Sequence, residues 1–113
     1  MSDAKRITWG KPRRPTDADR AALRDDLLTK ARAVRADGWA PHRTTWPTGQ
    51  TAVVAYLLGD TEILTDLEEN DATVLSRFAA DLFGFAGGRK DNEKGLVETQ
   101  AWFDTVRKAL GPA

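Results

Sequence analysis

The residues that could do chemistry in this chain are few, and His42 is the only imidazole among them. Its two serines, Ser2 and Ser76, lack the Gly-x-Ser-x-Gly context of a nucleophile. The lack of cysteine excludes disulfides, thiol redox centres, cysteine nucleophiles and zinc ribbons. His42 lies between Trp39 and Trp46, where a lone histidine is more typical of packing than of acid–base catalysis. We therefore predict a protein that is not an enzyme.

Acidic residues crowd into residues 60–71, but their spacing does not form a calcium loop. An EF-hand counted from Asp60 needs glycine at its sixth position and glutamate at its twelfth, where this chain has Thr65 and Asp71. The Glu-x-x-His pairs of helical di-metal carboxylate proteins do not occur either. We therefore expect no metal and no cofactor, and we interpret these acids as a solvent-exposed helix face.

The glycine-rich stretch 84–91 contains Arg89 and Lys90 ahead of an expected helix, and helix N-termini can bind anions. The Walker pattern is not met, because Arg89 occupies the position of its second glycine and Asp91 the position of its Ser or Thr. We interpret the stretch as a flexible turn between helices. Loose anion binding at Arg89 and Lys90 remains an open alternative.

Charge is balanced over the whole chain and unbalanced within it. The 113 residues include 17 Lys+Arg and 17 Asp+Glu, so the formal net charge is zero, which excludes a generally basic nucleic-acid binder. Residues 1–15 hold five basic residues and one acid, whereas residues 60–71 hold six acids and no basic residue. This segregation predicts local electrostatic contacts, either within the molecule or between molecules.

The protein is not expected to have a membrane partner. The longest apolar run, residues 52–58, is far shorter than the ~20 residues that span a bilayer. The basic N-terminus also lacks the apolar centre of a secretory signal. We therefore expect a cytoplasmic protein. An excess of Arg over Lys, 11 against 6, and a content of 17 Ala favour a bacterial or phage origin.

Tryptophan is the other unusual feature, because three of the four lie outside the helices that we expect. Trp and Arg are frequent anchors of protein interfaces, and an acidic segment can recognise a basic partner or the basic arm of a second copy. We therefore predict a small non-enzymatic adaptor or regulatory protein that binds a protein partner or associates with itself. The candidate partner-binding residues are Trp9, Trp39, His42, Arg43, Trp46, Asp60, Glu62, Asp66, Glu68 and Glu69.

The alternative function is that of an accessory nucleic-acid-binding protein, which would contact phosphates through its basic arm. A helix-turn-helix over residues 51–69 is a poor match, because its recognition helix would carry five acids and no basic residue and would be repelled by phosphates. The candidate nucleic-acid contacts are Lys5, Arg6, Lys11, Arg13, Arg14, Arg89 and Lys90.

Apolar periodicity predicts the helices that must position these residues. Thr16 and Asp19 form a capping-box pattern at the start of the first helix, and Asn92 is placed to cap the last. The segment 72–83 has a wide apolar face, which places it at the centre of the core. The expected helices are 16–37, 51–58, 61–69, 72–83 and 93–110.

Residues 51–58 are the ambiguous element, because a short apolar run fits either a helix or a strand. A hairpin over residues 42–58 is the alternative to a helix. We favour the helix, since the clear elements are helical and a lone hairpin is only marginally stable. Pro41 and Pro47 predict a non-helical connector over residues 39–49. The sequence thus predicts a single all-α domain, a bundle of four to five helices over residues 16–113, after an extended basic arm over residues 1–15.

Overall fold

The computed structural model describes residues 14–112. Within this range the chain forms helices and no strand, which confirms the all-α prediction and shows that the hairpin over residues 42–58 is wrong. The prediction for the arm over residues 1–15 falls almost entirely outside the described residues. The helices are α1 (Asp17–Asp37), α2 (Ala40–Arg43), α3 (Thr48–Leu58), α4 (Thr61–Asp66), α5 (Asp71–Glu93) and α6 (Val97–Leu110).

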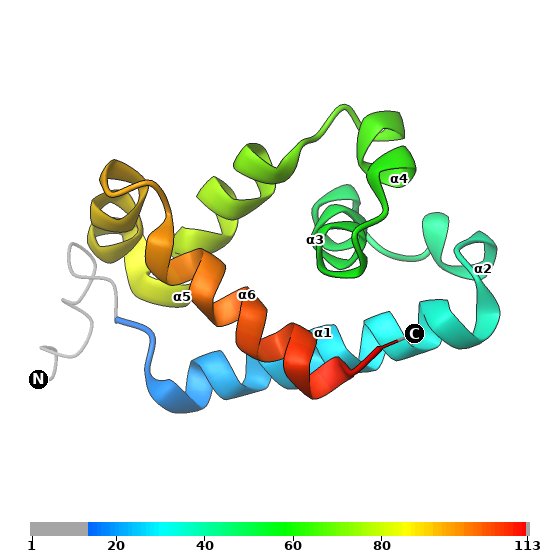
Figure 1. Ribbon diagram of the computed structural model, residues 1–113, viewed down its shortest axis with the longest axis horizontal. Helices are drawn as coiled ribbons and strands as arrows, with labels where there is room; N and C mark the ends of the chain where they lie inside the picture. The colour runs from blue at the N-terminus through cyan, green and yellow to red at the C-terminus, as the bar shows by residue number, and fades with distance from the viewer. Residues whose placement is uncertain (1–13, 113) are drawn as a thin grey trace, which may run out of the picture.

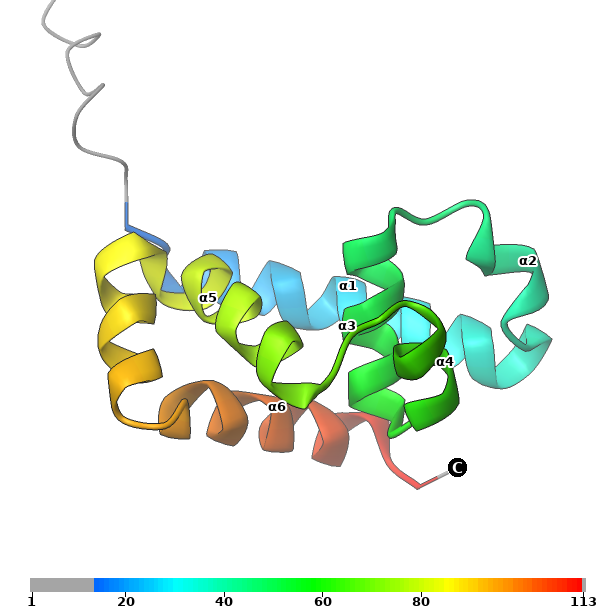
Figure 2. The same cartoon turned by 90° about the horizontal axis from the view of Figure 1, so that it is seen from above.

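Helix α3 is the centre of the bundle. Figures 1 and 2 show α1 and α6 running alongside each other, with α3 passing across them. Helix α3 also packs against α4 and α5. Seven consecutive residues, 51–57, are buried, because a helix that is apolar on all sides must be surrounded. The prediction that the segment 72–83 forms the centre is therefore wrong, although that segment contributes one wall of the core.

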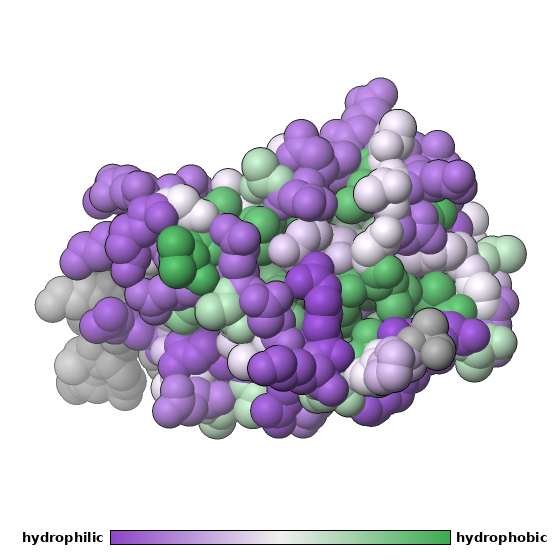
Figure 3. Space-filling view, viewed as in Figure 1, coloured by the Kyte–Doolittle hydropathy of each residue, from purple (hydrophilic) through white to green (hydrophobic). Residues whose placement is uncertain are grey.

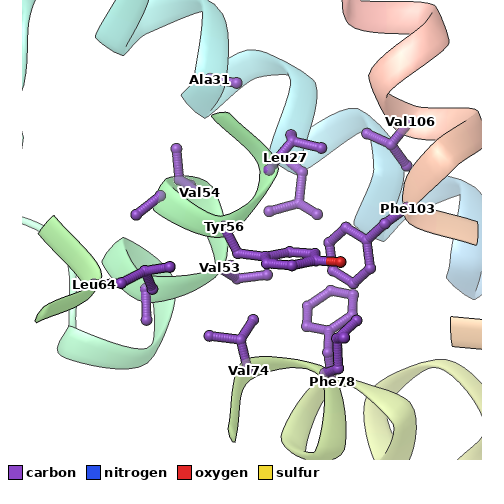
Figure 4. Close-up of a cluster of buried hydrophobic side chains, with 14 of the residues drawn as sticks. Leu27, Ala31, Val53, Val54, Tyr56, Leu64, Val74, Phe78, Phe103 and Val106 are labelled. Carbon is purple, nitrogen blue, oxygen red and sulfur yellow. The ribbon is translucent and has the colours of Figure 1, made fainter. Parts of the chain in front are cut away.

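Aromatic rings fill the space between α3, α5 and α6 (Figure 4). Phe103 of α6 is completely buried and meets the edge of Tyr56, with 4.9 Å between the ring centroids. It also packs against Phe78, at 5.2 Å between centroids. Leu27 and Val106 close the core on the side of α1 and α6. This single core fixes the relative positions of the two ends of the molecule.

Side-chain capping boxes begin α1 and α5 within one residue of the predicted starts. Thr16 and Asp19 form the expected capping box at α1, since each side chain accepts a hydrogen bond from the backbone N–H of the other. Asn70 and Thr73 form a second box at α5. Gly59 ends α3 in the left-handed conformation, with φ of 73° and ψ of 25°.

The predicted connector over residues 39–49 contains two helix starts. Pro41 lies in the first turn of the four-residue helix α2, where its missing N–H is not needed. Pro47 directly precedes α3, which begins at Thr48, three residues earlier than expected. The two prolines therefore begin helices instead of preventing them, and His42 lies within a helix.

The predicted turn at Gly84, Gly87 and Gly88 is mostly helical. Gly84 alone leaves the helical conformation, with φ of 81° and ψ of 174°, and the chain turns sharply there before residues 85–93 continue α5 (Figure 2). Gly88 lies against the first half of α5, because a Cβ on it would come within 2.8 Å of the backbone of Ala79 and Ala80. The missing side chain lets the two halves cross closely.

The start of α6 and the end of α4 also differ from prediction. Helix α6 begins at Val97 instead of residue 93, so Asn92 does not cap it; its side chain donates a hydrogen bond to Ser76 instead. Helix α4 ends at Asp66 instead of residue 69, and Glu68 has a positive φ of 58° that no helix contains. A residue with positive φ interrupts the helical backbone at both boundaries, since Leu96 before α6 has a φ of 63°.

Candidate functional site

The structure brings eight of the predicted partner-binding residues to one end of the molecule, which we call the α2–α4 end. In Figure 1, α2 and α4 lie at the end opposite the second half of α5. The residues come from the segment after α1, from α2 and its following loop, and from α4 and the residues next to it. They are Trp39, His42, Arg43, Trp46, Asp60, Glu62, Asp66 and Glu68.

Trp39 ties α4 to the end of α1. Its indole N–H donates a hydrogen bond to Oδ2 of Asp60 over 2.8 Å. The other carboxylate oxygen of Asp60 accepts the backbone N–H of Ile63 and so caps α4. Trp39 is half-buried and packs against the core. Both oxygens of Asp60 and the polar atom of Trp39 are therefore used within the fold.

His42 and Trp46 form a stacked pair, with 4.5 Å between the ring centroids and 15° between the planes. The His42 side chain is 17% exposed, and its Nε2 lies 3.8 Å from Oδ2 of Asp37. Among residues 14–112, that nitrogen is the one buried side-chain nitrogen or oxygen atom that has no hydrogen-bond partner. The Lys30 ammonium lies 5.8 Å from the centre of the Trp46 ring. The histidine side chain is therefore largely packed into this end of the molecule.

The acidic candidates divide into two groups. Glu69 accepts hydrogen bonds from the hydroxyl of Thr73 and the guanidinium of Arg77, and these two contacts, the first being the larger effect, hold its pKa below the usual value. Glu62 and Glu68 are exposed, and their side chains form no hydrogen bond or ion pair with another residue in the range 14–112. Asp66 is exposed too, and its carboxylate lies 3.9 Å from the guanidinium of Arg43. The outer surface of this end is therefore acidic.

The nucleic-acid candidates fall at the opposite end or outside the description. Lys5, Arg6, Lys11 and Arg13 lie outside the described residues, as does the partner-binding candidate Trp9. Arg14 and Lys90 line one hollow of about 340 Å³, which the start of α1, the second half of α5 and the start of α6 enclose. Arg89 is on another face of α5, with its guanidinium 5.7 Å from the ring centre of the exposed Phe85.

Two further cations that we did not predict line the same hollow, Arg20 and Lys94. Lys90 and Lys94 are four residues apart, which places them on one helix face. That spacing would have identified them if the helix had been recognised to continue past Gly88. Arg20 is held at the hollow by its hydrogen bond to the backbone carbonyl of Leu82 in α5, a long-range contact that has no signal in the sequence.

Hydrophilic side chains dominate the visible surface of the molecule, including the surface over the second half of α5 (Figure 3). Among residues 14–112, no group of three or more His, Asp or Glu side chains is placed to hold a metal ion. No helix in the same range is long and apolar enough to cross a membrane. The chain matches no family model, no curated protein and no solved structure.

Proposed function

We propose that this protein is a small non-enzymatic adaptor or regulatory protein, acting in the cytoplasm, that binds a basic protein surface through its α2–α4 end. The observation that carries the proposal is the set of exposed acids at this end, mounted on a frame of half-buried aromatic residues. The acids are Glu62, Asp66 and Glu68.

The aromatic frame supports binding because it fixes the surface before a partner arrives. The Trp39–Asp60 hydrogen bond holds the first turn of α4, and the stack of His42 on Trp46 holds α2 against the loop that follows it. A surface ordered in advance loses little conformational entropy on binding. The frame therefore contributes to affinity although its rings are only partly exposed.

Charge determines the kind of partner. Residues 59–71 contain no Lys or Arg, so Arg43 is the cation that faces the acids at this end. Clusters of one sign attract surfaces of the opposite sign and speed their encounter. The basic segment 1–15 of a second copy has this chemistry, so salt-sensitive self-association is one form of the proposed function.

The test measures binding of a fluorescent peptide with the sequence of residues 1–15 to the full chain, together with the mass of the protein by light scattering. We expect binding to weaken between about 0.01 M and about 0.1 M salt, where the Debye length falls from about 30 Å to about 10 Å. The double variant E62K/E68K should abolish it. The control Asp25→Lys changes an exposed acid of α1 and should bind like the wild type.

Circular dichroism of each variant checks that the helices persist. A salt-insensitive monomer that ignores the peptide would contradict the proposal. Equal binding by the wild type and E62K/E68K would contradict it as well, because the acids would then have no role.

A further inference from the structure

The hollow at the start of α1 combines concave shape with unpaired positive charge, and the proposed function does not use it. Its volume is about 340 Å³, and four of its lining residues are cationic. We propose that this hollow binds the phosphate groups of a nucleic-acid backbone. The cationic residues are Arg14, Arg20, Lys90 and Lys94.

Two of the four cations are available to a ligand. The side chains of Arg14 and Lys90 are exposed and form no hydrogen bond or ion pair with any other residue in the range 14–112. Both line the hollow, one from the segment before α1 and one from the second half of α5. A phosphate between them would receive charge-assisted hydrogen bonds from two sides, and the arginine fork matches its oxygens.

The third cation, Arg20, forms a fixed part of the wall. Its guanidinium donates to the backbone carbonyl of Leu82 over 2.9 Å and to the carboxylate of Asp17 over 2.6 Å. It also lies 5.8 Å from the ring centre of Phe83. A cation held in this way keeps its charge beside the hollow without losing side-chain entropy on binding.

The two carboxylates of the lining do not cancel this charge. Asp91 is only 3% exposed, and its oxygens accept the backbone N–H groups of Glu98 and Thr99 and the Thr99 hydroxyl. Its negative charge therefore faces the positive end of α6. Glu98 is paired with Lys94 over 2.7 Å. Four cations against two carboxylates leave the lining with a net charge of plus two.

The chain itself favours a polymer over a single anion. Pro15 packs against Gly84, with its Cδ 3.2 Å from where a Cβ would lie, so the N-terminal segment joins the body at the edge of the hollow. Four more basic residues precede Arg14 in that segment. A repeating phosphate backbone can pair with several of them at once, whereas an isolated phosphate cannot.

The residues that line the hollow also indicate that it does not recognise base sequence. It contains no Asn or Gln, the side chains that recognise adenine edges, and the Phe83 ring is covered by Arg20. Contacts to phosphates position a protein without reading sequence. We therefore expect binding that is independent of base sequence and strongly dependent on salt.

Fluorescence anisotropy with a labelled DNA duplex and one of its single strands tests the site. The double variant R14Q/K90Q should lower the affinity at least about tenfold and reduce the slope of log K against log salt by about two, since each lost phosphate contact removes about 0.9. The matched control R32Q/K108Q removes the same charge from exposed positions of α1 and α6 and should change the slope little.

Three results would overturn the proposal: no binding to either DNA at low salt, equal losses in the two double variants, or full competition by inorganic phosphate at the concentration of the DNA phosphates. The last result would mean that one phosphate is enough and that the polymer is not the ligand. E62K/E68K should leave DNA binding in place, so failure here and failure of the protein-binding proposal are distinguishable.

Discussion

The exposed acids of the α2–α4 end and the net positive lining of the hollow at the other end differ in how their charges are used. At the α2–α4 end, Asp60 and Glu69 are engaged in caps and pairs, and the remaining acids stand on a surface held by Trp39. At the other end, the fixed groups are Arg20 and Asp91, and the free cations stand around a hollow. The net charge of a segment therefore says little about its function. The charged side chains that are bound within the fold must first be distinguished from those that are free to meet a partner.

The largest effect is expected from a variant that disrupts the end with the hollow and leaves the α2–α4 end intact. Gly88→Ala would place a Cβ 2.8 Å from the backbone of Ala79 and Ala80, which cannot move aside as a flexible side chain does. We expect a loss of about 2–3 kcal/mol in the free energy of unfolding. The hollow should also open, with weaker DNA binding, while binding of the peptide at the α2–α4 end persists.

Urea denaturation measures the loss in this variant. Gly49→Ala is its control at the other end, since a Cβ there would meet only the Arg77 side chain, at 4.0 Å. A Gly88→Ala protein as stable as Gly49→Ala would show that the two halves of α5 do not need their close crossing.

The contribution of the buried Asp91 carboxylate to stability is expected to depend on pH. Burial raises the pKa of Asp91, but the hydrogen bonds from Thr99 and Glu98 together outweigh burial and hold the pKa below its usual value. The charged form therefore stabilises the fold above about pH 4, where an unfolded Asp is ionised. This contribution is lost as the pH falls from there through the folded-state pKa.

Asp91→Asn should cost about 1–2 kcal/mol at neutral pH, because an amide cannot accept all three hydrogen bonds in the same arrangement. Denaturation at several pH values is the measurement. The difference between wild type and variant should shrink as the pH falls below 4. A difference that is constant between pH 7 and pH 3 would rule out the carboxylate as the source.

The smallest expected effect concerns the aromatic frame. Trp39→Phe keeps a ring in place and removes the N–H that Asp60 accepts, so we expect a loss of about 1 kcal/mol. Peptide binding at the α2–α4 end should weaken by a few-fold, and DNA binding should not change. Thermal unfolding and both binding assays test this, and a selective loss of DNA binding would reverse the proposed roles of the two ends.

The fold class and several helix starts could be predicted because their causes are local. The capping boxes at Thr16 and Asn70 act over three residues, and the left-handed Gly59 acts on its own turn. The role of Gly88 could not be predicted, because it depends on contact with Ala79 and Ala80 in the other half of α5. From the sequence alone, a glycine that permits a turn cannot be distinguished from a glycine that permits close packing.

For the candidate sites, too, the residue types could be predicted from the sequence, whereas their long-range contacts could not. Arg14 and Lys90 were both predicted as nucleic-acid contacts, but the hollow that they share depends on a sharp turn at Gly84 followed by further helix, which the sequence did not reveal. Arg20 was missed because its partner carbonyl, that of Leu82, is 62 residues away. Trp39 and Asp60 were predicted as partner-binding residues, but nothing in the sequence indicated that they form a hydrogen bond with each other.

The cap that Asp91 provides for α6 has a consequence for the order of folding. Its hydrogen bonds join residues only seven and eight positions apart, so the second half of α5 and the start of α6 can meet with little loss of chain entropy. Contacts of such short range form quickly. The α5–α6 side of the hollow should therefore assemble early, and Thr99→Ala should slow folding more than it speeds unfolding.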